Sequence, residues 1–287
     1  MARGGVGLSA NVSSITLSIP TNPFLTDVQF GDFNQDGKQD IISSGSAMPL
    51  TINFGNGDGT YKAGSPIDSN KPNQIRIADI DNDGKLDIIG SLPGTGNFII
   101  YRGNGDGKFK SSTQTTSSKN NFRFEVLDIN ADGNVDIVTQ IGNGSTTGTN
   151  LIGILLGNGN GIFKAQTTFN LGTGITPFDI AVGDVNGDGK LDIVTANYQN
   201  DSASILLGNG NGGFTISPTR VGLGDGPKMV ALADMDNDGK LDLVSVNYLG
   251  SNISIARGNG NGTFLPAVHK ATSSQPVQLN IKDMNGE

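Results

Sequence analysis

The chain has 287 residues, 43 of them glycine, and its 27 acidic residues outnumber its 19 basic ones, so that its formal charge is −8. Glutamate occurs only as Glu125 and Glu287, which nearly removes the commonest surface helix former, and the absence of cysteine excludes disulfides and thiolate metal sites. The negative charge disfavours nucleic acid as a partner, and no apolar run is long enough for membrane insertion.

Residues 1–23 form an N-terminal segment ahead of the repeated part of the chain, which we place at residues 24–287. This segment lacks the apolar core of a signal peptide. It contains a strand-like stretch, Ser14–Ile19, that can act as a ring-closing strand for a circular array of repeats.

An acidic nine-residue pattern then occurs five times, and successive copies start 47 to 56 residues apart. The complete copies are Asp32–Asp40, Asp79–Asp87, Asp128–Asp136, Asp184–Asp192 and Asp234–Asp242. A sixth copy begins at Asp283 and is partial. A period of this size is typical of propeller blades.

Strand-like sequences surround each acidic pattern. Two and four residues before its first Asp an apolar residue occurs in all five copies, as in Ile180 and Val182, and this period of two indicates a strand with one buried face. A β-branched run follows, and then a Gly-Asn-Gly turn that ends in an aromatic residue, as in Gly208–Phe214. The fold expected is all-β: a β-propeller of four-stranded antiparallel blades, with five complete repeats and a partial sixth, from a parent of six or seven blades.

The combination of the Asp-rich loop with the Gly-Asn-Gly turn, as in Asp184–Asp192 followed by Gly208–Phe214, resembles the FG-GAP or VCBS repeats of integrin-like β-propellers. The resemblance covers Phe24–Glu287. It implies a propeller with Ca²⁺ in the hairpin between the first and second strands of each blade. It does not imply one activity, because such propellers occur as adhesion modules, as sugar-binding modules and as appendages of enzymes.

Side chains that carry oxygen alternate along each acidic loop, and hard oxygen ligands are what Ca²⁺ prefers. We predict about five Ca²⁺ sites, in which loop positions 1, 3, 5 and 9 supply side chains and position 7 supplies its backbone carbonyl. The predicted metal residues are Asp32, Asn34, Asp36, Lys38, Asp40, Asp79, Asp81, Asp83, Lys85, Asp87, Asp128, Asn130, Asp132, Asn134, Asp136, Asp184, Asn186, Asp188, Lys190, Asp192, Asp234, Asp236, Asp238, Lys240 and Asp242. Zinc is disfavoured because the chain has no Cys and only one His.

Two other interpretations of the acidic loops remain. An EF-hand or dockerin loop shares positions 1 to 6 but needs a Glu at position 12, where this chain has Ser43, Gly90, Thr139, Thr195 and Ser245. Clusters of Asp, Asn and Gly also form plain solvated turns. Three or four carboxylates in one short turn repel one another unless a cation is present, and this favours calcium.

A partner is expected on the face opposite the acidic loops, where the second strand of each blade connects to the third. The predicted ligand-binding residues are Tyr198, Asn200, Asn247 and Tyr248. Tyrosine beside amide side chains suits a sugar or a peptide. The same two tyrosines can instead pack within the blades.

The sequence therefore predicts a calcium-stabilised binding or adhesion module, extracellular or at the cell surface, that recognises a glycan or a protein. We expect it not to be an enzyme, because His269 is the only His and has no evident nucleophile partner. One alternative is a structural subunit that self-associates through open blade edges. Another is a non-catalytic accessory module of a secreted hydrolase.

Overall fold

The computed structural model describes residues 25–281, apart from residues 47, 118–120 and 142–149. This part of the chain contains 21 strands in five sheets and no helix. Accordingly, none of its described elements is a helix with the length and hydropathy needed to cross a membrane. The prediction of an all-β chain built from four-stranded antiparallel repeats is confirmed. The fourth sheet has a fifth strand that the sequence pattern did not predict.

Each sheet, or blade, takes its first four strands in chain order, and the fifth strand of the fourth sheet pairs with the third strand of that sheet. Blades 1 and 2 contain β1 (Leu25–Gly31), β2 (Asp40–Gly45), β3 (Met48–Asn53) and β4 (Ser65–Pro66), then β5 (Ile75–Ala78), β6 (Asp87–Ser91), β7 (Phe98–Tyr101) and β8 (Thr113–Thr115). Blades 3 and 4 contain β9 (Asn121–Leu127), β10 (Asp136–Ile141), β11 (Leu151–Leu155) and β12 (Thr167–Asn170), then β13 (Pro177–Gly183), β14 (Asp192–Asn197), β15 (Ser202–Gly208), β16 (Phe214–Ile216) and β17 (Val221–Gly222). Blade 5 contains β18 (Pro227–Ala233), β19 (Asp242–Asn247), β20 (Asn252–Ala256) and β21 (Val268–Ala271).

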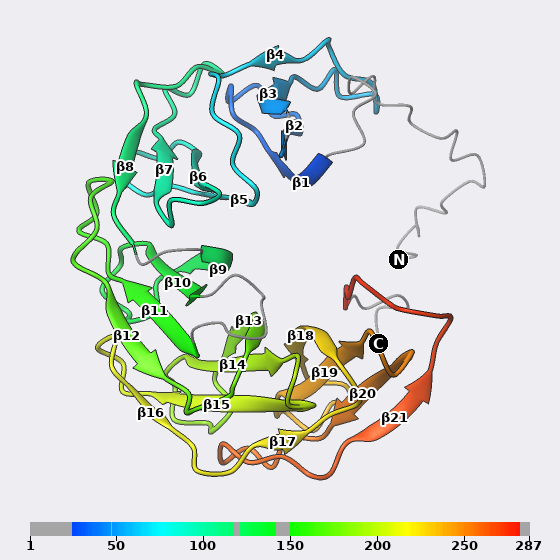
Figure 1. Cartoon of the computed structure of the whole chain (residues 1–287). Helices are drawn as coiled ribbons and strands as arrows, with labels where there is room; N and C mark the ends of the chain where they lie inside the picture. Colours follow the sequence, from blue (N-terminus) through cyan, green and yellow to red (C-terminus); the bar gives the residue numbers. More distant parts are fainter. Residues whose placement is uncertain (1–24, 47, 118–120, 142–149, 282–287) are drawn as a thin grey trace, which may run out of the picture.

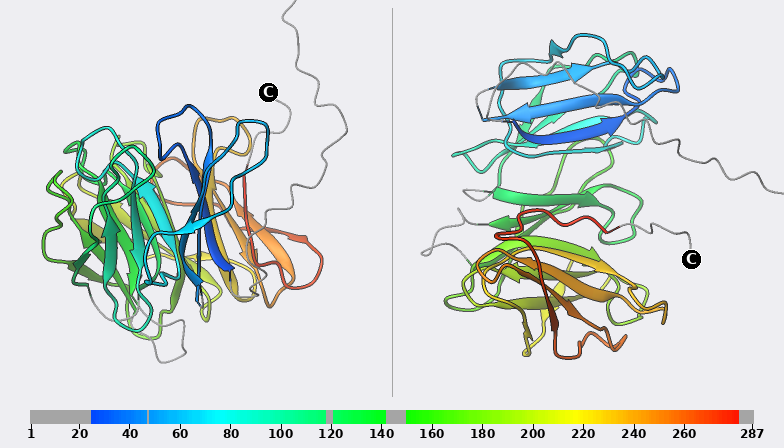
Figure 2. Two further views of the ribbon diagram at one scale, coloured as in Figure 1. Left: turned by 90° about the horizontal axis from the view of Figure 1, so that it is seen from above. Right: turned by 90° about the vertical axis from the view of Figure 1, so that its right-hand side faces the viewer.

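The five blades surround a common centre, with the first strand of each blade innermost (Figure 1). They form an arc with an opening between blade 1 and blade 5 (Figure 1). The two side views show the strands of all blades crossing one layer, so that their loops lie on its two faces (Figure 2). The N-terminal segment 1–23 with its predicted ring-closing strand, and the sixth acidic copy at Asp283, lie outside the described residues. The number of blades in a parent ring stays a prediction.

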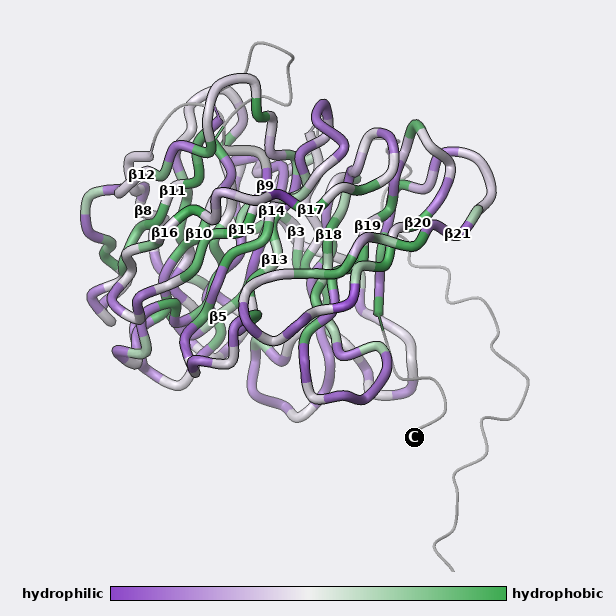
Figure 3. Tube along the Cα trace, turned by 90° about the horizontal axis from the view of Figure 1, so that it is seen from below, coloured by the Kyte–Doolittle hydropathy of each residue, from purple (hydrophilic) through white to green (hydrophobic). Residues whose placement is uncertain are grey.

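The hydrophobic core is divided into four clusters, each between two successive blades. Between blades 1 and 2, Ile42 and Ile52 pack with Ile88 and Ile99. The next residue along β7, Ile100, belongs instead to the cluster between blades 2 and 3, because alternate strand residues point to opposite faces. Along the chain, the strands are mostly hydrophobic and the loops mostly hydrophilic (Figure 3). Blades 2, 3 and 4 therefore each contribute to two clusters, one with each neighbour, whereas blades 1 and 5 each contribute to one.

The second residue of each acidic loop joins its blade to the next one. In three loops its carbonyl accepts a hydrogen bond from a glycine of the next blade's Gly-Asn-Gly turn, and these pairs are Phe33 with Gly107, Ile80 with Gly161 and Val185 with Gly262, at 3.0 to 3.1 Å. Its side chain is 2 to 3 % exposed in the four loops that face a following blade, at Phe33, Ile80, Ile129 and Val185. The fifth, Met235, is 46 % exposed, because no described blade packs over it.

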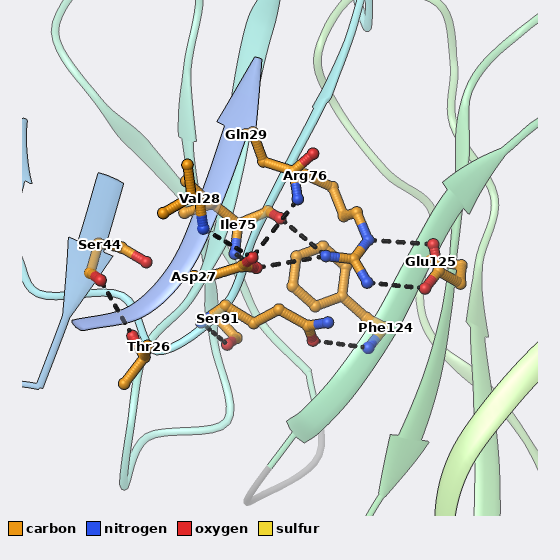
Figure 4. Close-up of polar contacts among 11 residues, drawn as sticks. Thr26, Asp27, Val28, Gln29, Ser44, Ile75, Arg76, Ser91, Phe124 and Glu125 are labelled. Atoms are coloured by element: carbon orange, nitrogen blue, oxygen red, sulfur yellow. Dashed lines mark hydrogen bonds and ion pairs between the residues drawn. The ribbon is translucent and has the colours of Figure 1, made fainter. Parts of the chain in front are cut away.

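A charged clasp joins the innermost strands of the first three blades (Figure 4). The guanidinium of Arg76 in β5 donates to both carboxylate oxygens of Glu125 in β9, at 3.0 and 2.7 Å, and lies 3.3 Å from Asp27 in β1. Burial disfavours the charge of Arg76, but the hydrogen bond and the charge of Glu125 outweigh it, so the pKa of Arg76 is raised. One side chain thus links three blades.

Hydrogen bonds between inner strands add to this clasp. The residue five positions before an acidic loop accepts the backbone N–H of the residue four positions before the next loop. These pairs, each at 3.0 Å, are Asp27 with Ile75, Gln74 with Phe124 and Asp179 with Val230. The same position holds Arg123 in blade 3 and Met229 in blade 5, whose side chains carry no acceptor oxygen.

Candidate metal centres

The acidic loops share a backbone conformation that their sequence makes possible. Position 6 is glycine in every copy, with φ of 78 to 83°. Position 4 also lies in the left-handed region, with φ of 56 to 59° where the residue is not glycine, as in Asn82 and Ala131. Glycine accepts this conformation without steric cost, so the Gly at position 6 is required by the turn.

The first Asp of each loop holds the turn through backbone N–H groups. In blade 2, Asp79 accepts Asp83 N–H at 3.0 Å on one oxygen and Gly84 N–H at 2.8 Å on the other. The bond to the position-6 glycine occurs in all five loops at 2.8 Å. These hydrogen bonds orient the carboxylate at the start of the loop before any ion is considered.

The last Asp of each loop connects the acidic loop to the Gly-Asn-Gly turn of the same blade. In blade 3, Asp136 accepts Ile129 N–H at 3.0 Å and Gly157 N–H at 2.7 Å. The equivalent pairs of bonds are made by Asp40, Asp87, Asp192 and Asp242. All five of these residues are at most 1 % exposed. Sequence reasoning assigned them only to the metal and missed their structural role.

Position 3 divides the loops into two kinds. It is Asp in blades 2 and 5 and Asn in the other three. In the loops with Asp, carboxylate oxygens from positions 1, 3 and 9 lie within 4.8 Å of one another, and these groups are Asp79 with Asp81 and Asp87, and Asp234 with Asp236 and Asp242. In the loops with Asn, the side-chain oxygen of Asn34 accepts Asp36 N–H at 3.1 Å, and that of Asn186 accepts Asp188 N–H at 2.9 Å.

The second loop fits a hard divalent cation. Oδ1 of Asp81 is buried and has no hydrogen-bond partner, and a buried acceptor without a partner is unfavourable unless something else satisfies it. Burial, supported by the charges of Asp81 and Asp83, raises the pKa of Asp87 to about 6. A cation held by Asp79, Asp81 and Asp87 would satisfy the free oxygen and offset this repulsion.

Position 5 and the basic residue at position 7 form a pair at the surface of the loop. The Lys Nζ lies 2.9 to 3.8 Å from the outer carboxylate oxygen in four loops, and these pairs are Lys38 with Asp36, Lys85 with Asp83, Lys190 with Asp188 and Lys240 with Asp238. The lysine therefore has a role for its side chain, whereas sequence reasoning used only its carbonyl. The predicted carbonyl ligand at position 7 stays a prediction.

Two further basic residues lie at the two loops that have the extra Asp. Lys110 Nζ is 3.8 Å from Asp81 Oδ2, and an Arg257 nitrogen is 3.2 Å from Asp236 Oδ2. Both flank the Gly-Asn-Gly turn of the same blade, since Lys110 follows Phe109 and Arg257 precedes Gly258. They compensate for the additional carboxylate, and only the folded blade brings them there.

The predicted ligand residues lie on the face opposite the acidic loops, and they make close contacts with neighbouring residues. Tyr198 packs on Phe178 with ring centroids 5.5 Å apart, and Asn200 Oδ1 accepts Thr176 N–H at 3.3 Å. The ring of Tyr248 lies under Lys228 Nζ at 4.3 Å, and its hydroxyl donates to Gln275 at 3.1 Å. Part of each tyrosine ring therefore packs against residues of its own blade, which is the alternative interpretation of these two residues.

Asn247 is fully buried, unlike a surface ligand residue. Its amide nitrogen donates to Asn252 and Ser254 at 2.6 and 2.7 Å, and its oxygen accepts the hydroxyl of Ser245 at 2.9 Å. Asn197 has the equivalent network in blade 4. The structure therefore places Asn247 inside the blade, as a bridge between neighbouring strands.

The single histidine has a serine neighbour that the sequence did not indicate. His269 Nδ1 lies 3.0 Å from Ser254 Oγ. Ser254 is fully buried, and its hydroxyl oxygen also accepts hydrogen bonds from Asn247 and from Gly224 N–H at 2.7 and 2.9 Å. A hydroxyl in this state cannot reach a substrate, so the pair lacks the accessibility of a catalytic dyad.

Five blades with one shared loop and turn define a repeat protein of the β-propeller class. A family model described as FG-GAP-like repeat matches residues 32–90, 79–139, 128–195, 184–245 and 234–287. The chain therefore belongs to the family of FG-GAP-like repeat proteins. No curated protein matches its sequence.

Solved structures similar to this chain have different activities. An Agrocybe aegerita lectin that recognises non-reducing terminal N-acetylglucosamine is 23 % identical, with a TM-score of 0.59, over 92 % of this chain and 68 % of the lectin chain. The periplasmic gluconolactonase of Pseudomonas aeruginosa is 12 % identical, with a TM-score of 0.63, over 86 % of this chain and 70 % of that one. At such identities the likeness shows the propeller fold alone.

Proposed function

We propose that this propeller is a calcium-stabilised, non-catalytic binding module. The observation that carries the calcium assignment is the second acidic loop, where oxygens of three carboxylates lie within 4.8 Å of one another and Asp81 Oδ1 is buried without a partner. The other loops repeat its backbone and its buried position-9 Asp. Calcium would be held by the side chains at positions 1, 3, 5 and 9, and by binding all of them it would hold the two ends of each loop together.

Calcium in these loops acts on the stability of the whole blade. The position-9 Asp bonds to both the acidic loop and the Gly-Asn-Gly turn, and that turn bonds to the preceding blade. For a Kd of roughly 0.1 mM and roughly 1 mM free Ca²⁺, mass action contributes about 1.4 kcal/mol per site, or about 7 kcal/mol for five sites. This is comparable with the total stability of a typical domain.

Thermal unfolding followed by circular dichroism, in 1 mM Ca²⁺ and in EGTA, tests the calcium proposal. Because each kcal/mol shifts Tm by about 2 to 4 °C in a chain of this size, chelation should lower Tm by roughly 10 °C or more. Mg²⁺ at the same concentration should restore little of the loss, since Mg²⁺ demands stricter octahedral geometry and gives up water reluctantly. An unchanged Tm in EGTA would contradict the proposal.

The proposed activity is recognition of a glycan or a protein outside the cell. Support for a binding role comes from the two faces of the arc, because one face is occupied by the acidic loops and turns while the other carries the tyrosines of blades 4 and 5. An argument against catalysis is that Ser254, beside His269, is buried and its hydroxyl is already occupied by hydrogen bonds. A screen of glycans and extracellular matrix proteins, with and without calcium, tests the role: a calcium-dependent ligand supports it, and turnover of any such ligand contradicts it.

Self-association is a second candidate, favoured by the exposed apolar residues at the opening of the arc. Phe30 on β1 is 55 % exposed, and Met235 in the loop after β18 is 46 % exposed. Their counterparts between successive blades are buried or half-buried. We propose that these two faces pair with further β structure, such as a second copy of the chain. Sedimentation equilibrium tests this: a concentration-dependent mass supports it, and a monomer at all concentrations contradicts it.

A further inference from the structure

A recess lies between blades 1 and 2, beside the outer strand β4. Its volume is about 700 Å³, which is in the range of small-molecule sites. Blade 1 contributes Phe54 and Asp68, and blade 2 contributes Tyr101, Lys108, Phe109 and Lys110. It is separate from the tyrosines of blades 4 and 5 considered above.

The aromatic wall of the recess is fixed by packing. A Cβ atom at Gly107 would overlap the ring of Phe54, so the glycine is what lets this ring lie against the backbone of the next blade. Phe109 contacts Phe33 and Tyr101, with ring centroids 6.1 and 6.4 Å apart. Phe54 and Phe109 are half-buried, so each leaves part of its ring facing the recess. A wall held in this way needs no rearrangement to receive a ligand.

A buried polar pair stands next to this wall. The hydroxyl of Tyr101 donates to Asp68 Oδ1 at 3.0 Å, and Tyr101 itself is 1 % exposed. Burial and the neighbouring carboxylate raise the pKa of Tyr101, so the hydroxyl stays protonated and Asp68 stays the acceptor. Asn70 donates its backbone and side-chain N–H groups to the same carboxylate, at 2.8 and 2.6 Å. Asp68 is thereby oriented while remaining half-exposed.

The equivalent recess between blades 4 and 5 has a different lining. Its volume is similar, about 660 Å³, and Phe264 takes the place of Phe109. The positions of Phe54 and Tyr101 are occupied there by Leu207 and Ala256, so the aromatic wall and the tyrosine–carboxylate pair are both missing. The shape of the recess comes from the repeat, whereas its chemistry belongs to blades 1 and 2.

We propose that the recess between blades 1 and 2 binds a saccharide of one or two pyranose rings. Aromatic faces such as Phe54 and Phe109 receive the apolar C–H face of a sugar, while a fixed carboxylate such as Asp68 accepts its hydroxyl groups. Ser65, Ser111 and Ser112 line the same recess, and serine hydroxyls are both donors and acceptors. This inference rests on the proposed binding function and names a place and a ligand class for it.

Saturation-transfer NMR on the full chain in millimolar Ca²⁺ tests the saccharide site. The probes are N-acetylglucosamine, galactose, mannose, fucose and glucuronic acid, each at millimolar concentration, followed by titration of those that bind. Ser65→Trp fills the recess from an exposed rim position, and Thr219→Trp does the same in the equivalent recess between blades 4 and 5. We expect at least one sugar to bind, with affinity lowered at least tenfold by Ser65→Trp and unchanged by Thr219→Trp.

Two further variants separate binding from folding. Ser112→Trp enters the recess from blade 2 and should also abolish binding, and Asp68→Asn, which can still accept the Tyr101 hydroxyl, should weaken it at least threefold. A sugar that binds Ser65→Trp and Ser112→Trp as tightly as the unmodified chain overturns the saccharide site but leaves the binding function standing. Failure of every sugar to bind overturns the site as well, and a protein ligand found in the wider screen would then preserve the binding function.

Discussion

At the scale of single residues, the acidic loops divide their carboxylates between two tasks. The position-9 Asp, such as Asp136, is buried and bonded to two backbone N–H groups, whereas Asp81 keeps a buried oxygen without a partner. Burial raises the pKa of Asp136 to about 6, despite the two N–H groups that favour its charge. The position-9 carboxylate therefore stabilises the fold in addition to being a proposed ligand of the ion, whereas the buried oxygen of Asp81 has no structural bond to lose and serves the ion alone.

Substitution separates these two tasks. Asp136→Ala leaves two buried N–H groups without an acceptor, so we expect a loss of about 2 to 4 kcal/mol in the free energy of unfolding, in EGTA as well as in calcium. Asp81→Asn introduces the residue that three other loops already have, and it should leave the EGTA value within about 0.5 kcal/mol while weakening calcium binding. Urea unfolding and calcium titration measure both; equal effects in EGTA would refute the division.

Asp179 predicts a pH dependence that is independent of the loops. Burial raises its pKa to about 6, against about 3.9 in the unfolded chain, although Arg123 and Val230 N–H lower it. The folded state then binds more protons between these values, so this group's contribution to stability falls as pH rises from 4 to 6. Asp179→Asn, which can still accept Val230 N–H, should raise the free energy of unfolding by about 1 to 3 kcal/mol at pH 7, with little change at pH 4.

Urea unfolding of the Asp179→Asn variant and the unmodified chain across pH 4 to 8 checks this. Exposed Asp58, whose pKa is lowered by its hydrogen bonds to Thr60, provides the control substitution Asp58→Asn. If the difference in the free energy of unfolding between the variant and the unmodified chain does not grow from pH 4 to pH 6, the raised pKa of Asp179 is contradicted.

At the scale of strands and blades, contacts between neighbours hold the arc together. Each cluster of core residues lies between two blades, and hydrogen bonds from one inner strand to the next repeat along the arc. Arg76 is the member of this set that touches three blades (Figure 4). Its removal therefore tests whether blades are coupled through their inner strands.

Arg76→Met keeps the length and the apolar part of the side chain but leaves Asp27 and Glu125 without their shared cation. Because the three side chains are only partly buried, we expect a loss of about 1 to 3 kcal/mol in the free energy of unfolding, less at high salt. Arg220→Met, which removes a single bond to the carbonyl of Leu171, is the matched control and should cost less than about 1 kcal/mol. Equal losses for the two variants would exclude a special role for the clasp.

At the scale of the whole molecule, the opening of the arc leaves two blade faces with exposed apolar residues. Met235→Lys replaces one of them without touching the backbone bond from Met235 N–H to Asp242. If these faces associate, the variant should weaken the association constant at least tenfold in sedimentation equilibrium. Ile162→Lys, at a similarly exposed apolar residue in the turn of blade 3, should leave it unchanged. Equal weakening by both would point to non-specific association.

The repeat itself was readable from sequence. Alternating apolar residues before each Asp, glycine at loop position 6 and the Gly-Asn-Gly turn each depend on local backbone geometry, and these local requirements predict the strands, the turns and their order. The difference between the loops at position 3, which is Asn34 in the first loop and Asp81 in the second, is also visible in the sequence.

Tertiary structure decided what depends on residues far apart in the chain. Four features join residues on different strands, turns or blades. They are the hydrogen bond of Asp136 to the Gly-Asn-Gly turn, the approach of Lys110 to Asp81, the burial of Asn247 and the charged clasp around Arg76. The recess between blades 1 and 2 likewise exists only once Phe54 and Phe109 meet across a blade boundary. Sequence periodicity determined the blade because its signals are local, whereas contacts between distant side chains arise only from the packing of one blade on the next.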